Sequence, residues 1–240
     1  AVINNFAMQY VAHRLGITND FPVTRSLALG VISVSVLDMT SSYAALASGG
    51  YKTPSFGITR ITNLRGETVY QHDPDAPRPR VLDARIVRDL NSMFRNVVVA
   101  GTGRRANIEG VPAAGKTGTT SSYRDAWFCG FTGNYVAAVW MGNDDYHPTN
   151  RVTGGSLPAT IWQKFMAFAH SNIEIKPAYG IDFTPEPFKP TVETASAEDD
   201  AALRPPTLKP EAARKLLDLA DLFHKGLDGV GSVPLKQAVY

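Results

Sequence analysis

The sequence predicts an α+β fold in which an antiparallel sheet is flanked by helices. Two observations lead to this class. Three largely apolar segments of strand length follow one another at about residues 112–120, 125–132 and 134–142, with short turns between them, as neighbouring antiparallel strands do. Segments with apolar residues at helical spacing stand before and after this group, so helices are expected to cover the sheet.

The N-terminal part of the chain is expected to form two helices. Residues 3–15 carry apolar side chains at helical spacing, and Gly16 suits a C-cap. Asp38 is expected to N-cap a second helix over residues 39–47, which stops at the glycine pair that follows.

A hairpin and a long helix are expected next. Residues 57–64 alternate as a strand, Arg65-Gly66 makes the turn, and residues 67–70 return as the partner strand. After a proline-containing loop, Asp83 is expected to cap an amphipathic helix that runs to about Val99.

The three-strand group and a closing helix complete the predicted domain. Gly133-Asn134 provides a tight turn that pairs the last two strands antiparallel. The third strand is nearly all apolar, as in a strand covered on both faces. Residues 157–169 are predicted to be a helix with Pro158 in its first turn.

The character of the sequence changes after about residue 177. Residues 1–177 are interpreted as one domain, and residues 178–240 as a Pro-rich linker and tail. Within the tail, residues 211–225 carry a helical apolar stripe. We expect a short helix there rather than a specific partner motif.

Composition excludes several classes of function. The net charge of +2 gives no basis for nucleic-acid binding. The single cysteine, Cys129, excludes an internal disulfide framework. The five histidines are scattered without metal-ligand spacing, so no metal site is expected. The 240 residues contain no apolar run long enough for a membrane span and begin without Met, and we expect them to be a piece of a longer polypeptide.

The stretch Lys116-Thr117-Gly118-Thr119-Thr120 carries the chemistry that this sequence suggests. On a strand, alternate residues share a face, so Lys116, Gly118 and Thr120 point the same way. An ammonium group attracts an anionic substrate group, and threonine hydroxyls can bind a carboxylate. The backbone N–H of Thr119 can stabilise an oxyanion. The alternative is a strand with an exposed lysine and a glycine bulge, because three-residue motifs recur by chance.

The surroundings of this stretch favour the chemical interpretation. Residues 113–134 read AAGKTGTTSSYRDAWFCGFTGN, and this sequence resembles the transpeptidase domain of class A (bifunctional) penicillin-binding proteins. Further stretches are similar to the same family in the same order, namely VLDMTSSYAALASGG at 36–50, VAGTGRRA at 99–106 and TGGSLPATIW at 153–162. The resemblance covers about residues 1–170.

The resemblance implies a fold and an activity. The fold would be that of serine β-lactamases and penicillin-binding proteins, incomplete at its N-terminus. The activity would be D,D-transpeptidation of peptidoglycan through a serine acyl-enzyme, with the D-Ala-D-Ala end of a stem peptide as substrate and β-lactams as inhibitors. No metal or organic cofactor is implied. The parent protein would be membrane-anchored and act on the periplasmic face of the bacterial cytoplasmic membrane.

The resemblance also assigns roles to residues. Lys116 would be catalytic, and Thr117, Gly118, Thr119 and Thr120 would bind substrate. Asn4, or Asn5 with a slip of one residue, would match the asparagine of the family's Ser-x-Asn element, although a helix-start residue is an equal interpretation of Asn4.

The family's Ser-x-x-Lys element is absent from this sequence. None of the nine lysines has Ser or Thr three positions before it. The isolated chain is therefore expected not to be acylated, because it lacks the nucleophile. Two alternatives stay open, a serine β-lactamase or D,D-carboxypeptidase with the same motif, and a non-catalytic module that binds peptidoglycan or a partner.

Several other residues are weighed and given structural roles. Arg104, Arg105 and Tyr123 could line the mouth of a cleft, but solvated loop residues are the default. Cys129 is interpreted as a small buried hydrophobe rather than a nucleophile. A catalytic carboxylate role for Asp125 is not favoured.

Overall fold

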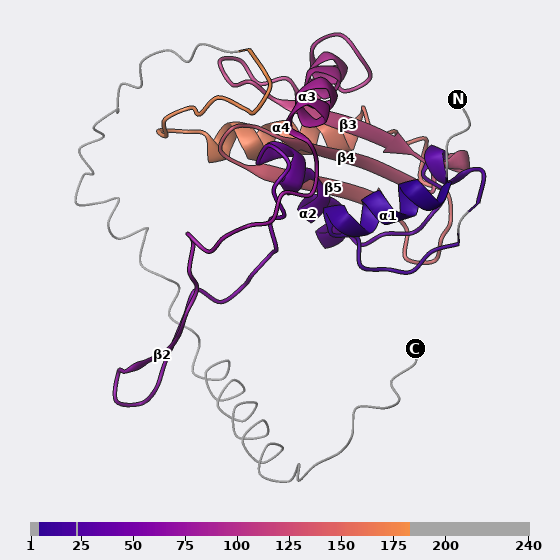
Figure 1. Ribbon diagram of the computed structural model, residues 1–240. Helices are drawn as coiled ribbons and strands as arrows, with labels where there is room; N and C mark the ends of the chain where they lie inside the picture. Colours follow the sequence, from indigo (N-terminus) through magenta and orange to yellow (C-terminus); the bar gives the residue numbers. More distant parts are fainter. Residues whose placement is uncertain (1–4, 23, 183–240) are drawn as a thin grey trace, which may run out of the picture. The chain divides into compact units, whose positions relative to one another are not determined.

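A computed structural model of the chain describes residues 5–22 and 24–182 (Figure 1). The chain divides into two units, Ala1–Pro190 and Thr191–Tyr240, and the described residues belong to the first. Asn4, most of the predicted linker and the helical stripe at residues 211–225 lie outside the described residues.

The described residues form an α+β fold, as the sequence predicts. The main elements in chain order are α1 (Asn5–Leu15), α2 (Val36–Ala47), β1 (Arg60–Thr62), β2 (Thr68–Gln71), α3 (Ala84–Val99), β3 (Ala114–Thr119), β4 (Asp125–Phe131), β5 (Val136–Gly142) and α4 (Leu157–Ala169). Short 3-10 turns, η1 (Leu27–Leu29) and η2 (Arg104–Ala106), join them.

The main sheet contains β3, β4 and β5 in that order, with both pairs antiparallel (Figure 1). The three strands predicted between residues 112 and 142 are confirmed. The turn between β4 and β5 contains the predicted Gly133-Asn134. The hydroxyl of Thr132 holds this turn by accepting the backbone N–H groups of Asn134 and Tyr135, each at 3.1 Å.

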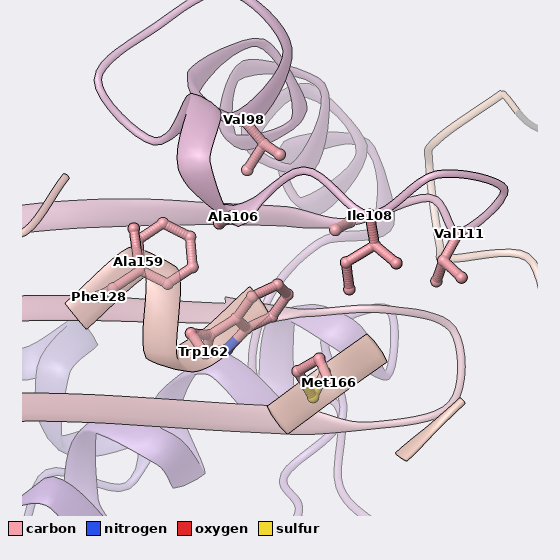
Figure 2. Close-up of a cluster of buried hydrophobic side chains, with 9 residues drawn as sticks. Val98, Ala106, Ile108, Val111, Phe128, Ala159, Trp162 and Met166 are labelled. Carbon is pink, nitrogen blue, oxygen red and sulfur yellow. The ribbon is translucent and has the colours of Figure 1, made fainter. Parts of the chain in front are cut away.

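The two faces of the sheet bury two separate clusters, because neighbouring residues of a strand point to opposite sides. Phe128 points into the first cluster, where it packs against Trp162 of α4 at a ring separation of 5.1 Å (Figure 2). Cys129 points into the second cluster, with Tyr43 and Leu46 of α2. Helices α4 and α2 therefore cover opposite faces.

Helix α3 joins the two clusters. Its Val87 lies in the second cluster and its Val98 in the first. Asp83 caps the helix by accepting the backbone N–H of Arg85 at 2.8 Å, so the predicted cap is confirmed. Asn91, fully buried, donates to the backbone oxygens of Leu46 and Tyr179 at 3.1 and 2.9 Å.

The predicted start of the second helix is wrong. Helix α2 begins at Val36, and its N-cap is Ser35, whose hydroxyl accepts the backbone N–H of Asp38 at 3.0 Å. Asp38 lies inside the first turn, and its carboxylate accepts the hydroxyl of Thr18 at 3.1 Å. Both residues are common caps three positions apart, and the neighbouring Thr18 holds Asp38 in the later position.

Two further strand predictions are confirmed with adjustments. The first hairpin forms, but β1 is shorter than predicted, β2 is shifted by one residue, and every residue in both strands is exposed. Strand β5 is packed on both faces, as expected, since Ala137 and Val139 contact the first cluster and Val136 and Ala138 contact the second. Its residues are only partly buried, however, and Trp140 is 37% exposed.

The packed part of the chain continues past residue 177. Ala178 and Ile181 are buried in the second cluster, so the core extends beyond the boundary that composition suggested. Within the described residues, no helix is long and apolar enough to cross a bilayer.

Candidate active site

Strand β3 carries the predicted motif. Its first two residues, Ala114 and Gly115, are buried, whereas Lys116 and Thr119 are exposed. The buried start is tightly packed, because a Cβ on Gly115 would lie 2.6 Å from the backbone oxygen of Cys129. The sequence thus anchors one end of β3 in the core and leaves the motif accessible.

The outer edge of β3 offers polar backbone groups. The backbone N–H of Thr120 donates to the backbone oxygen of Asp125 at 3.0 Å. Hydrogen-bonded and non-bonded pairs alternate in an antiparallel ladder, so the N–H and C=O groups of Thr117 and Thr119 point away from β4. The Thr119 N–H has the direction that an oxyanion donor at this edge requires.

The side chain of Lys116 lies at this same edge. Its Nζ donates to the backbone oxygen of Thr117 at 2.9 Å. Lys116 pairs with Cys129 in the register and therefore starts from the face that α2 covers. The long side chain brings a positive charge to the outer edge of the strand.

The hydroxyls of Thr117 and Thr119 arise on the opposite face, toward α4. The Oγ1 of Thr117 lies 2.7 Å from the Oγ1 of Thr102, in the loop after α3. The Oγ1 of Thr119 accepts the backbone N–H of Gly154 at 3.0 Å. Strand β3 thus carries an ammonium that starts from one face and two oriented hydroxyls on the other, and both kinds of group can bind a carboxylate.

Thr120 differs from the other predicted site residues. Its hydroxyl accepts the backbone N–H of Asp125 at 2.8 Å and donates to the Asp125 carboxylate at 3.1 Å. The same carboxylate accepts the indole N–H of Trp140 at 3.0 Å. These contacts close the turn between β3 and β4, and the Thr120 hydroxyl is engaged in them.

The turn between β3 and β4 is held in an uncommon conformation. Ser122 and Tyr123 have φ of 61° and 56°, in the left-handed region that costs a non-glycine residue free energy. Thr149 braces the turn, since its backbone N–H and hydroxyl both donate to the oxygen of Tyr123, at 2.9 and 2.6 Å. Tyr123 is 39% exposed beside the motif.

The two arginines before β3 lie in η2 and are exposed. Arg105 donates to the backbone oxygen of Gly155 at 3.4 Å, which links η2 to the loop before α4. In the part of the chain that the structure describes, no group of three or more potential metal ligands is present.

Cys129 is confirmed as a buried hydrophobe. It is 2% exposed, and burial raises its pKa from an ordinary value of 9.0 to about 12. A thiol of this kind stays protonated and is a poor nucleophile at neutral pH.

Sequence reasoning did not assign functions to Thr102 and Gly154. Both lie in stretches that carry the family resemblance, GTGRRA and TGGSLPA. Only folding brings them beside Thr117 and Thr119. Their position within glycine-rich stretches that resemble the family was the one signal in the sequence that could have pointed to a role.

A helix-covered antiparallel sheet with the Lys-Thr-Gly triplet on its outer strand defines the class of penicillin-binding and β-lactamase serine acyl-transfer domains. The family described as Penicillin binding protein transpeptidase domain matches residues 12–167. The chain therefore belongs to the penicillin-binding protein transpeptidase family.

Bacterial relatives agree with this membership. The chain is 30% identical to Penicillin-binding protein 1A of Pseudomonas aeruginosa, over 68% of this chain and 26% of that protein. It is 36% identical to Penicillin-binding protein 1A of Aquifex aeolicus, over 65% of this chain and 21% of the relative. The chain thus spans about a quarter of the length of these relatives.

Solved structures support the fold. PonA1 from Mycobacterium tuberculosis superposes with a TM-score of 0.63 at 24% identity, covering 75% of this chain and 55% of PonA1. The complex of PonA1 with penicillin V gives a TM-score of 0.60 over 73% of this chain and 54% of that one. Penicillin-Binding Protein 1A from Haemophilus influenzae gives a TM-score of 0.62 at 21% identity, over 78% of this chain and 36% of that one.

Proposed function

We propose that this chain supplies one wall of the acyl-transfer site of a peptidoglycan D,D-transpeptidase that also binds penicillin. The observation that carries the proposal is the outer edge of β3. The Lys116 ammonium, the Thr117 and Thr119 hydroxyls and the outward N–H of Thr119 all belong to four consecutive residues of this strand.

The chemistry follows from these groups. A serine hydroxyl attacks the carbonyl carbon between the two D-Ala residues of a stem peptide, and the Thr119 N–H stabilises the oxyanion that forms. The C–N bond breaks, and the released D-Ala amine takes the proton that the serine lost. An amine of a second stem peptide then attacks the ester, which frees the serine and forms the cross-link.

Each wall residue has a defined task. Lys116 supplies positive charge that attracts the substrate carboxylate and favours deprotonation of neighbouring groups. Thr117 and Thr119 donate hydrogen bonds to the carboxylate. Gly118 adds no side chain to the surface of the strand at this point. A Cβ there would lie 3.2 Å from the Cβ of Trp127. The contacts of Thr120 favour a role in the turn.

The serine nucleophile and the asparagine of the Ser-x-Asn element are part of the same proposal. The 240 residues contain no Ser-x-x-Lys, so the serine is assigned to a segment of the longer protein outside this sequence. Asn4 is proposed as the asparagine of the Ser-x-Asn element. The protein would be membrane-anchored and would work on the periplasmic face.

Acylation of the longer protein by benzylpenicillin, followed by intact mass spectrometry, tests this function. We expect an adduct equal to the mass of the whole penicillin that persists for many minutes. Rapid loss of the adduct with turnover would identify a β-lactamase, and absence of any adduct would favour a non-catalytic binding module. The isolated 240-residue chain is expected to stay unmodified under the same conditions, because it holds no acylatable serine motif.

A further inference from the structure

We infer that Thr102 and the backbone N–H of Gly154 are positioning groups that aim the hydroxyls of Thr117 and Thr119 at the carboxylate of a bound ligand. The inference rests on the proposed function and adds a specificity device to it. Neither group belongs to the Lys-Thr-Gly-Thr stretch itself.

The Gly154 amide fixes the polarity of the Thr119 hydroxyl. A backbone N–H can only donate, so the Thr119 Oγ1, 3.0 Å away, must accept. The hydroxyl hydrogen of Thr119 therefore has to point elsewhere. Thr119 is exposed at the strand edge, where that hydrogen can be donated to a ligand oxygen.

Thr102 acts on the Thr117 hydroxyl in a related way. Their oxygens lie 2.7 Å apart, and either can donate. When a carboxylate accepts the Thr117 hydrogen, Thr102 can donate to the Thr117 oxygen, which gives a chain from Thr102 through Thr117 to the ligand. Hydrogen bonds in such a chain polarise one another and strengthen the last one.

Rigid backbone holds both groups in place. Gly101 and Gly103 form a turn against the end of α3, where the Gly103 N–H donates to the Val97 oxygen at 3.0 Å and fixes Thr102 between them. A Cβ on Gly155 would lie 2.2 Å from the backbone oxygen of Thr102. The loop before α4 and the loop after α3 therefore contact each other directly behind the strand edge.

This arrangement predicts selectivity for a negatively charged ligand end. The Thr119 hydroxyl, whose hydrogen is directed away from Gly154, and the Thr117 hydroxyl, which can donate while it accepts from Thr102, match the acceptor-only oxygens of a carboxylate, as does the Lys116 ammonium. A carboxamide in the same place would present N–H groups to these donors. Thr102 is thus expected to contribute to binding of acids and not to binding of their neutral counterparts.

The test compares two substrates in the longer protein that carries this chain. One is an N-acylated D-alanyl thioester whose leaving group bears a carboxylate, and the other is its carboxamide counterpart. Thr102→Val, which removes the hydroxyl at nearly constant volume, is expected to lower kcat/KM for the carboxylate thioester about tenfold, the effect of weakening one charge-assisted hydrogen bond. The carboxamide thioester should change less than twofold.

Two further variants make the result specific. Thr102→Ser keeps the hydroxyl and should restore most of the activity toward the carboxylate thioester. Thr68→Val, on the exposed strand β2, should change neither reaction. An equal loss with both thioesters, or no loss with either, in Thr102→Val would overturn the inference alone. A wild-type protein that reacts with neither thioester would overturn the proposed function, and the inference with it.

Discussion

Cys129 illustrates how burial governs a single residue. It lies in the second cluster with Tyr43, and burial raises the pKa of both side chains. Each therefore keeps its proton in the folded chain at neutral pH, and neither offers an anion for chemistry. The groups that we propose for function are instead on β3, where Lys116 and Thr119 are exposed.

A prediction about alkaline stability follows. The Cys129 thiol has a pKa of about 12 in the folded chain and ionises near 9.0 when unfolded. Below pH 9 the thiol is protonated in both states. As the pH rises between the two values, ionisation stabilises only the unfolded chain, so the free energy of unfolding falls.

Chemical denaturation of the 240-residue chain and of Cys129→Ala at pH 7 and pH 10 measures this contribution. The wild-type chain should lose about 1 kcal/mol more stability than the variant between these pH values. The cavity left by the substitution costs the same at both pH values and cancels. Equal losses would mean that the thiol is accessible to water in the folded chain.

At the scale of elements, the packing of the loop before α4 against β3 is the contact that organises the site. A Cβ on Gly154 would lie 2.1 Å from the Trp127 oxygen and 2.5 Å from the Gly118 oxygen. Both obstacles are backbone atoms of the sheet, which cannot move aside cheaply. The glycine at this position therefore permits the close approach that brings its N–H to Thr119.

Gly154→Ala is expected to destabilise the 240-residue chain by about 1–3 kcal/mol. Gly57→Ala is the matched control, because no atom lies within 4 Å of a Cβ built there; it should change stability by less than about 0.5 kcal/mol. Urea denaturation monitored by tryptophan fluorescence measures both. Similar effects of the two substitutions would contradict the close packing of this loop.

Helices with a strong local pattern could be predicted from the sequence. Residues 157–169 and the Asp83-capped α3 were predicted closely, because each segment has hydrophobic residues at helical spacing and a local start signal, Pro158 in the first turn of α4 and the Asp83 cap of α3. The start of α2 was misplaced, because Ser35 and Asp38 are both suitable caps and the tertiary contact with Thr18 distinguishes them. The partial exposure of β5 depends on which elements neighbour it, which its own residues do not encode.

The candidate site was predictable only in part for the same reason. Lys116 through Thr119 are contiguous and carry a recognisable pattern. Thr102 and Gly154 contact these residues from distant parts of the chain. No spacing rule joins such positions, since the contacts depend on how α3 and α4 pack around the sheet.

At the scale of the whole molecule, we propose that the described fold supplies one wall of an acyl-transfer site. Strand β3 pairs with β4 and packs against α3, and Lys116 and Thr119 on it are exposed. The family membership rests on residues 12–167. We propose that the outer edge of β3, and Lys116 above all, serves acylation by penicillin in the longer protein.

The most direct measurement is the second-order rate of acylation by a labelled penicillin, compared between Lys116→Ala and Lys164→Ala in the longer protein. Lys164 is an exposed lysine of α4 and controls for loss of one positive charge. We expect Lys116→Ala to lower the rate at least about 100-fold, the effect of removing one electrostatic stabiliser, and Lys164→Ala to change it less than about twofold. An unchanged rate in a folded Lys116→Ala protein would contradict the account, because the triplet would then be only a strand.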